Sequence, residues 1–334
     1  MAPAALGLDI GGANLKAAHS SGVACLRPYA LWKNPGGLPE ALRQLIGDMP
    51  PHDLLAVTMT GELCDCFETK RQGVESILAA VELIASDSRF CIWRNDGRFV
   101  NLDGARADPL AVAAANWLAL ATFAGRFAPQ GPALLIDIGS TTSDIVPISD
   151  GKPVPRGRSD PARLRYHELV YRGIRRTPVC ALLGGAGAAE LFATTLDVYL
   201  VLGDLPEEQT DRDTADGRPA TKAAACARLA RMLCADREPC PEREVRKLAL
   251  QIRHRQLRLL RRAVKYVAAS MPGPPTTLIT AGSGEFLVAK MLSERHGAAG
   301  QRLSLAALLG PSISQAACAY AVAVLAAEGH GHGQ

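Results

Sequence analysis

The polarity pattern of the chain alternates between short apolar runs and longer amphipathic stretches. The short apolar runs predict strands at Ala5–Ile10, Leu54–Met59, Phe90–Ile92, Leu134–Ile138, Asp144–Ile148, Val198–Leu202 and Thr277–Thr280. The longer stretches predict helices at Leu38–Ile46, Gly73–Ile84, Leu110–Phe123, Thr221–Leu233, Glu242–Ser270, Glu285–Glu294 and Gln315–Ala327. Strands that alternate with helices are typical of an α/β protein.

This α/β pattern divides into two parts at Phe127–Pro132, a segment with the composition of a linker. Each part opens on an apolar strand that ends in an aspartate and a glycine turn, which indicates a weak internal duplication. A chain of 334 residues is also long for one compact core. We therefore predict two lobes around a central ligand cleft, residues 1–130 and 131–334, and leave open that the last helix packs back on the first lobe.

Two aspartates, Asp9 and Asp137, stand near the ends of the strands that open the two parts. A buried carboxylate is costly unless it has a partner. Mg²⁺ is a suitable partner, because it prefers oxygen ligands and is held by one or two carboxylates together with substrate phosphates. The sequence therefore predicts that Asp9 and Asp137 are metal ligands, and both are also candidates for catalysis.

The residues that follow the two aspartates are suited to binding phosphate. Glycine-rich turns leave main-chain N–H groups pointing outward, and glycine lets a ligand approach the backbone closely. Lys16 adds a positive charge to the first turn, and three hydroxyl groups add donors to the second. The predicted phosphate-binding residues are Gly11, Gly12, Asn14 and Lys16 in the first turn and Gly139, Ser140, Thr141 and Thr142 in the second.

Two further segments have features of a binding site. A Gly-Ser-Gly turn follows the strand Thr277–Thr280 and begins a helix, whose free N–H groups suit an anion or a nucleotide. A Thr-Gly-Glu segment follows Leu54–Met59, where sites gather in open α/β sheets, although it would also suit a helix cap. The residues predicted to contact substrate or nucleotide are Thr60, Gly61, Asp144, Arg176, Gly282, Ser283, Gly284 and Glu285, and Glu62 is a third catalytic candidate.

Composition narrows the classes of partner. The formal net charge of +4 is too small to predict nucleic-acid binding, and the Ala-rich apolar stretches suit a packed core better than a bilayer. The nine cysteines include no Cys-x-x-Cys pair, which predicts reduced thiols in a cytoplasmic protein. We expect small-molecule partners, no nucleic acid and no membrane, and leave a homodimer open.

The order of the three glycine-rich turns resembles the superfamily of sugar kinases, heat-shock chaperones and actin. In the segment "DIGSTTSD", Asp137 and Asp144 have a spacing similar to that of the chaperones. The resemblance implies a two-lobed, actin-like α/β fold with a duplicated ribonuclease H-like unit. It also implies that the first two turns bind phosphate and that the late turn binds adenosine.

Four motifs resemble a narrower group, the hydantoinase/oxoprolinase-like family. They are "MTGELCDCFETKRQGV" (Met59–Val74), "YRGIRRTPVCAL" (Tyr171–Leu182), "DGRPAT" (Asp216–Thr221) and "AGSGEFL" (Ala281–Leu287). The resemblance implies tetrahydromethanopterin-linked one-carbon metabolism and the biosynthesis of methanofuran or methylofuran. The implied enzyme is a transferase that joins an aminomethylfuran diphosphate to the phenol of a glutamyltyramine and releases diphosphate.

That reaction needs Mg²⁺ at the diphosphate and does not require ATP, although ATP would suit the same site. A general base would help the phenol to attack, and Asp9, Asp137 and Glu62 remain open for this role. Two other functions also remain open. The first is an ATP-dependent kinase or a hydantoinase/oxoprolinase-type amidohydrolase, although oxoprolinases are much longer chains. The second is a nucleotide-gated, actin-like interaction protein.

Overall fold

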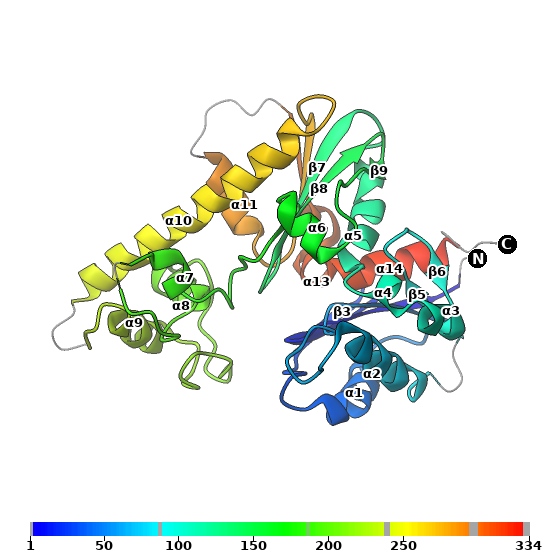
Figure 1. Ribbon diagram of the computed structural model, residues 1–334, viewed down its shortest axis with the longest axis horizontal. Coiled ribbons are helices and arrows are strands. Elements are labelled where there is room, and N and C mark those ends of the chain that lie inside the picture. Colours follow the sequence, from blue (N-terminus) through cyan, green and yellow to red (C-terminus); the bar gives the residue numbers. More distant parts are fainter. Residues whose placement is uncertain (1–2, 86–88, 186, 237–240, 294–299, 330–334) are drawn as a thin grey trace.

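The computed structural model describes residues 3–85, 89–185, 187–236, 241–293 and 300–329, and within them the chain forms two six-stranded sheets (Figure 1). The first sheet has the order β3 (Ala24–Pro28), β2 (Asn14–His19), β1 (Ala5–Ile10), β4 (Leu54–Met59), β5 (Arg89–Trp93) and β6 (Phe99–Val100). The second has the order β10 (Leu169–Val170), β8 (Ser143–Ser149), β7 (Pro132–Ile138), β11 (Thr277–Ala281) and β12 (Gln301–Ser304), with β9 (Lys152–Pro153) paired to β8.

The two sheets repeat one topology. β1 pairs antiparallel with β2 and parallel with β4, and β7 pairs antiparallel with β8 and parallel with β11. In the first sheet, β3 pairs with the outer side of β2, the second strand of the hairpin. In the second sheet, β9 and β10 pair in the same way with β8. The predicted fold class is therefore confirmed: a two-lobed, actin-like α/β fold with a duplicated ribonuclease H-like unit. The lobe limits at residues 130 and 131 stay a prediction.

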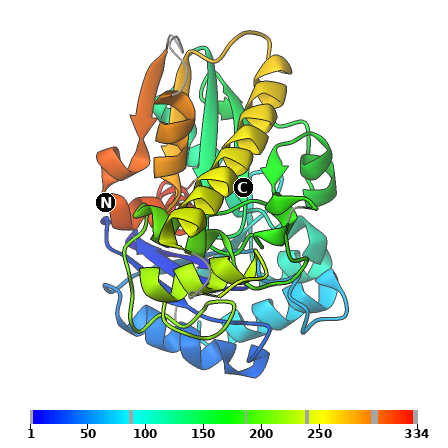
Figure 2. The same ribbon diagram turned by 90° about the vertical axis from the view of Figure 1, so that its left-hand side faces the viewer.

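Helices cover the outer faces of both sheets and fill the space between them. They are α1 (Leu38–Gly47), α2 (Lys70–Glu82), α3 (Leu102–Ala107), α4 (Pro109–Val112), α5 (Asn116–Ala124), α6 (Asp160–Arg165), α7 (Cys180–Leu183), α8 (Thr195–Leu202), α9 (Lys222–Arg231), α10 (Glu242–Ala269), α11 (Glu285–Ser293), α12 (Leu305–Leu309), α13 (Pro311–Gln315) and α14 (Ala317–Ala327). The apolar faces of α1 and α2 pack on the first sheet, and α10 and α11 pack on the second, with α10 running diagonally across it (Figure 2). None of the described helices is long and apolar enough to cross a bilayer.

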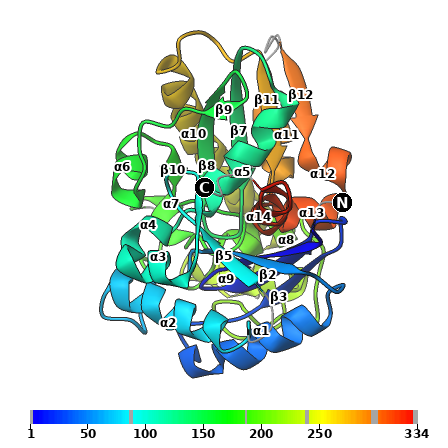
Figure 3. The same cartoon turned by 90° about the vertical axis from the view of Figure 1, so that its right-hand side faces the viewer.

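Two apolar helices, α5 and α14, lie between the sheets (Figure 3). One buried cluster joins their side chains to Ala56 and Trp93 of the first sheet and to Leu135 and Ile279 of the second. α14 also contacts β1 so closely that a Cβ on Gly7 would lie 1.9 Å from the carbonyl oxygen of Ala319. These helices hold the two hairpins in a fixed mutual position, which decides where their turns meet.

A group of short helices, α7 to α9, packs on one end of the long helix α10, away from the first sheet (Figure 1). Its interior holds a buried ion pair between Arg228 and Asp197 at 2.7 Å. The hydroxyl of Tyr199 donates to Gln256 of α10 at 2.7 Å, and the amide of Gln256 donates to the carbonyl of Gly173. The helical group is thereby tied to the segment that precedes Arg176.

One predicted strand, Val198–Leu202, is wrong because this segment belongs to helix α8. All of Thr195–Val201 is buried, so no polar face marks the helical period, and the apolar run resembles a strand. Thr194 and Asp197 form a capping box at the start, and Gly203 ends the helix with a φ of 75°.

Two predicted helices are also interrupted. The stretch Leu110–Phe123 breaks into α4 and α5 at Ala113 and Ala114, where Ala113 is extended and Ala114 has a φ of 47°. The stretch Gln315–Ala327 begins with the end of α13 and continues as α14. The other predicted helices lie within two or three residues of the observed ones, and Glu294 lies outside the described residues.

Candidate active site

Two hairpins place charged side chains opposite each other at the same point of each sheet. In the first hairpin, Asp9 of β1 pairs in register with Lys16 of β2. In the second, Asp137 of β7 pairs in register with Asp144 of β8. Residues directly opposite each other in an antiparallel pair have neighbouring side chains, so like charges there repel. One hairpin therefore carries a balanced pair of charges, and the other carries two carboxylates.

Asp9 is only half satisfied by the protein. Its Oδ2 lies 3.4 Å from Nζ of Lys16, and its side chain is 3% exposed. Its Oδ1 is buried and has no hydrogen-bond partner in the described part of the chain. Burial lowers the pKa of Lys16, but the charges of Asp9 and Asp137 outweigh that effect and raise it. Lys16 is therefore protonated, whereas one oxygen of Asp9 is left without a partner from the described residues.

Asp137 lies beside charges from both halves of the molecule. Its side chain is partly exposed, and burial together with the charge of Asp144 raises its pKa to about 7. Lys16 of the first hairpin lowers that pKa, whereas Asp9 raises it further. The two predicted metal ligands and the predicted lysine thus lie within electrostatic reach of one another, at the meeting point of the two hairpins.

Asp144 is engaged by the protein. Its Oδ1 lies 2.9 Å from Nη1 of Arg163, whose side chain is 1% exposed and whose guanidinium carbon lies 3.9 Å from the ring centroid of Trp117. Burial raises the pKa of Asp144, and Arg163 opposes that shift. Asp144 is therefore interpreted as a neighbour that tunes Asp137, with Arg163 as its counter-ion.

The raised pKa of Asp137 predicts a pH dependence of stability. Without added metal, the folded protein keeps a proton on this carboxyl up to a pH of about 7, whereas its ordinary pKa is 3.8. The group therefore favours the folded state below a pH of about 4, and that contribution is lost as the pH rises to about 7. In urea unfolding between these pH values, the wild type should lose more stability than the variant Asp137→Asn. Parallel pH profiles would contradict the raised pKa.

The turns themselves are shaped by main-chain contacts. The amide of Gly11 donates to the carbonyl of Asn14, and the amide of Gly139 donates to that of Thr142. Gly173 packs on the second turn, since a Cβ there would lie 2.4 Å from the amide nitrogen of Thr141. All eight predicted phosphate-binding residues of the two turns are partly exposed. Within the described residues, no main-chain acceptor is found for the amides of Gly12, Ala13, Ser140, Thr141 and Thr142, and these amides can donate to an anion.

The segment Thr60–Glu62 is attached to the first turn. The amides of Thr60 and Gly61 both donate to the carbonyl of Ile10, and a Cβ on Gly61 would lie 3.3 Å from the amide nitrogen of Gly12. Thr60 is exposed, so its hydroxyl is accessible beside the turn. The segment thus lies beside the first turn at the end of β4, the part of an open α/β sheet where sites gather.

Glu62 is enclosed by other groups. Its side chain is 1% exposed, and its Oε1 lies 3.2 Å from Nζ of Lys70. Lys70 also lies 2.9 Å from Asp160 on α6, which belongs to the second half of the chain. Burial raises the pKa of Glu62, and the charge of Lys70 opposes that shift. We interpret Glu62 as part of a polar link between the halves, rather than as a base facing substrate.

The late Gly-Ser-Gly turn supports Asp137. Gly282 has a φ of 86°, and a Cβ there would lie 2.3 Å from Oδ1 of Asp137. Gly284 packs against Ile138, and Ser283 between them is half-buried. The absent side chains of the two glycines thus leave room for the carboxylate and its strand.

The Glu285 carboxylate at the end of this turn is fully used by neighbouring groups. It accepts hydrogen bonds from the hydroxyls of Thr280, Ser304 and Ser314 and from the amide of Ala306. The amide of Gly282 is also engaged, because it donates to Ser314. These contacts indicate a structural role for Glu285 and Gly282, whereas the sequence predicted contacts with substrate or nucleotide.

The composition of the site fits a hydrated magnesium ion shared with a phosphate chain. Within the described residues no three His, Cys, Asp or Glu side chains form a metal cluster. A site for Mg²⁺ needs fewer protein ligands, since the ion keeps several waters and takes oxygens from phosphates. The unpartnered oxygen of Asp9 and the partly exposed carboxyl of Asp137 supply ligands of this type.

Sequence reasoning missed several residues around the site. Arg163 and Lys70 are the counter-ions of predicted carboxylates. Cys318 of α14 lies near Asp9 and Asp137. Burial is the main cause that raises the pKa of its thiol, and the charges of the two aspartates raise that pKa further. None of the three stands in a glycine-rich turn, so no local pattern marks them. Only the packing of α6, α2 and α14 against the hairpins brings them to the site.

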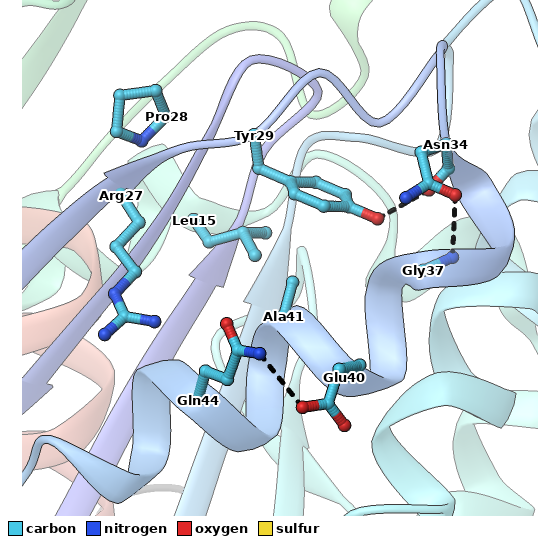
Figure 4. Close-up of a pocket in the computed structure, with 9 residues that line it drawn as sticks. All are labelled: Leu15, Arg27, Pro28, Tyr29, Asn34, Gly37, Glu40, Ala41 and Gln44. Atoms are coloured by element: carbon cyan, nitrogen blue, oxygen red, sulfur yellow. Dashed lines mark hydrogen bonds between the residues drawn. The ribbon is translucent and has the colours of Figure 1, made fainter. Parts of the chain in front are cut away.

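A separate cavity of about 320 Å³ lies between α1 and the edge formed by β2 and β3 (Figure 4). The hydroxyl of Tyr29 donates there to the carbonyl of Asn34, and Glu40 accepts a hydrogen bond from Gln44. None of the predicted site residues lines this cavity. Arg27, which also lines the cavity, pairs with Asp48. The cavity is therefore distinct from the site at the turns.

Comparison with known proteins identifies the family that this sequence matches. The family model for hydantoinase/oxoprolinase matches residues 53–328. A Methanocaldococcus jannaschii protein named (4-{4-[2-(gamma-L-glutamylamino)ethyl]phenoxymethyl}furan-2-yl)methanamine synthase is 33% identical over 331 residues, covering 96% of each chain. A Methanococcus vannielii protein of the same name is 35% identical over 169 residues, which are 48% of this chain and 75% of that protein.

Solved structures support the fold. The nucleotide-free structure of acetone carboxylase covers 96% of this chain with 70% of its own length, at 10% identity and a TM-score of 0.57. At an identity this low, the similarity supports the fold alone.

Proposed function

Because the chain belongs to the hydantoinase/oxoprolinase family, we propose that it is a synthase that forms an aryl ether in methanofuran or methylofuran biosynthesis. The donor would be an aminomethylfuran diphosphate, and the acceptor would be the phenol of a glutamyltyramine. The proposal is supported by the relative that spans 96% of the chain, whose name describes a phenoxymethyl group on a furan. The observation in the structure that carries it is the pair of turns from both halves that meet at Asp9 and Asp137.

The proposed reaction transfers an alkyl group. The bond between the furanylmethyl carbon and the diphosphate oxygen breaks, and its electron pair stays on diphosphate. The phenol oxygen forms the new bond to that carbon and loses its proton. In this proposal, Lys16 and the amides of Gly12, Ser140 and Thr141 would stabilise the charge that develops on the leaving group.

Asp9 and Asp137 would hold Mg²⁺, which would neutralise part of the diphosphate charge. Glu62 is closed to solvent and paired with Lys70, so we do not assign the phenol proton to it. The departing diphosphate gains negative charge in this step, and we propose that its oxygens accept the proton. With this assignment, neither aspartate has to act as the base in addition to its proposed role at the metal.

The direct test is ether formation by the purified protein from the furan diphosphate and γ-glutamyltyramine with Mg²⁺. We expect one diphosphate for each ether, with no requirement for ATP. Ether formation that depends on ATP, or ATP hydrolysis driven by either substrate, would contradict the transferase and favour a kinase or an ATP-dependent amidohydrolase. Assembly driven by nucleotide would favour an actin-like interaction protein.

The variant Lys16→Ala should raise the KM for the furan diphosphate by about 10- to 100-fold, because a charge-assisted contact contributes about 1.5–3 kcal/mol. The KM for the acceptor should change little. Steady-state kinetics with each substrate varied in turn provide the measurement, and Lys152→Ala, an exposed lysine on β9, is the matched control. A Lys16→Ala enzyme with the KM of the wild type would exclude Lys16 from the diphosphate site.

A further inference from the structure

Trp32 and Arg176 make a contact between the two halves directly beside the phosphate turns. The guanidinium carbon of Arg176 lies 4.3 Å from the ring centroid of Trp32. Trp32 follows Leu31, whose amide donates to the carbonyl of Gly12 in the first turn. The amide of Arg176 donates to the carbonyl of Ser140 in the second turn. The indole and the guanidinium are thus each attached to one turn and stack on each other.

Arg176 has donors that the protein does not use. In the described residues its Nη1 is buried without a hydrogen-bond partner, and the nearest carboxylate oxygen in an ion pair, Oδ2 of Asp213, lies 4.0 Å away. The neighbouring Arg175 differs, because its guanidinium lies 2.7 Å from Asp211. Stacking on Trp32 orients the guanidinium of Arg176 and leaves its edge available for a bidentate contact.

The groups around Arg176 differ from those around the carboxylates. The pKa of Asp137 is lowered by the charge of Lys16, and that of Asp144 by Arg163. Arg176 instead lowers the pKa values of Cys64 and Tyr171. These electrostatic neighbourhoods place Arg176 beside the diphosphate site rather than at its centre.

The surface next to Arg176 is suited to a ring. Burial, followed by neighbouring acidic groups, raises the pKa of the Cys64 thiol to about 11, so this thiol stays neutral. It packs over the first turn, where a Cβ on Gly12 would lie 2.6 Å from its sulfur. Leu63 and Tyr171 are exposed by 64% and 54%, which leaves apolar and aromatic surface in the same segments. A neutral thiol, an indole and a phenol suit an aromatic molecule, and the free guanidinium edge suits an anionic group on it.

We propose that Trp32 and Arg176 form the acceptor subsite, in which Arg176 binds the carboxylate of the glutamyl tail and so selects an acidic aromatic acceptor. This inference rests on the proposed function, since it names how that reaction's second substrate is recognised. Arg176 acts here as a specificity-determining residue. The phenol end of the acceptor lies toward the turns, and its carboxylate lies toward Arg176 in the segment that precedes α7.

The test compares γ-glutamyltyramine with tyramine, which lacks the carboxylate, as acceptors for the wild type, Arg176→Ala and Arg175→Ala. The wild type should prefer γ-glutamyltyramine. Arg176→Ala should raise the KM for γ-glutamyltyramine by about 10- to 100-fold and remove the preference, since hydrogen bonds between charged groups are worth that much. The KM for tyramine and for the furan diphosphate should stay within about twofold, and Arg175→Ala should resemble the wild type.

An Arg176→Ala enzyme with an unchanged preference, or one whose KM rises for the furan diphosphate instead, would overturn the subsite and leave the proposed function intact. Calorimetric binding of γ-glutamyltyramine to the protein with Mg²⁺ and inorganic diphosphate separates the two claims. Binding that Arg176→Ala weakens would support the subsite even if no ether forms. A wild type that does not bind γ-glutamyltyramine would overturn the subsite. Thermal unfolding of each variant verifies that it is folded.

Discussion

The variant Asp137→Asn should form ether at least about 10³-fold more slowly than the wild type, with an unchanged fold. Asparagine has nearly the same shape as aspartate, but it is neutral and a weak ligand for Mg²⁺. The site would therefore lose a metal ligand at the point where charge develops on the leaving diphosphate. Single-turnover assays with both substrates at saturation measure this effect directly.

The matched control is Asp48→Asn, an exposed aspartate paired with Arg27 on the outer edge of the first sheet. Its rate should remain within about twofold of the wild type, as for most surface substitutions. An Asp137→Asn enzyme with wild-type turnover would place the reaction elsewhere in the molecule. A fold lost in Asp137→Asn is not expected, because removing one of two opposed carboxylates relieves repulsion with Asp144.

The second large effect is expected at Gly282, which does not touch substrate in this account. Gly282→Ala should lower turnover by about 10²-fold, because small displacements of a reacting group are costly. The new Cβ would lie 2.3 Å from Oδ1 of Asp137 and 2.4 Å from the carbonyl oxygen of Ile138, so the carboxylate and its strand must move. The φ of 86° would also be strained for alanine, at a cost of about 1–3 kcal/mol in unfolding free energy.

Gly273→Ala is the control for this variant, since Gly273 has open space around its Cβ position and no left-handed φ. It should change neither the rate nor the unfolding midpoint in urea beyond small amounts. A Gly282→Ala enzyme that loses stability but keeps full turnover would show that the late turn does not position Asp137. The same variant with a normal rate and normal stability would contradict the described packing of the turn.

The fold class could be predicted from the sequence because the signals that mark its strands and its duplication are local. The strands β1, β4, β7, β8 and β11 are apolar enough to be recognised, and the aspartate that closes each first strand marks the duplication. The segments that failed did so for two reasons. α8 is buried on every side, so burial removes its period. The strand β2 and the strands at the sheet edges are too short or too polar to predict. Topology in the second sheet therefore had to come from the structure.

The sequence predicted the charged residues at the centre of the candidate site, but it did not predict the residues that surround them. Asp9, Lys16 and Asp137 stand next to glycine turns, so their chemistry is visible in the sequence, and the structure brings them together. The state of a buried carboxylate depends on residues far along the chain, such as Arg163 for Asp144 and Lys70 for Glu62. The same holds for Glu285, which the sequence suggested as a ligand contact and which four protein donors occupy.

In the proposed site, Asp9 and Asp137 jointly hold one magnesium-bound diphosphate, and a calorimetric titration with inorganic diphosphate measures that binding. We predict that the wild type binds one diphosphate for each chain only when Mg²⁺ is present. Asp9→Asn and Asp137→Asn should each abolish this binding separately. Diphosphate binding that is equally strong without Mg²⁺, or that survives in either variant, would contradict the account.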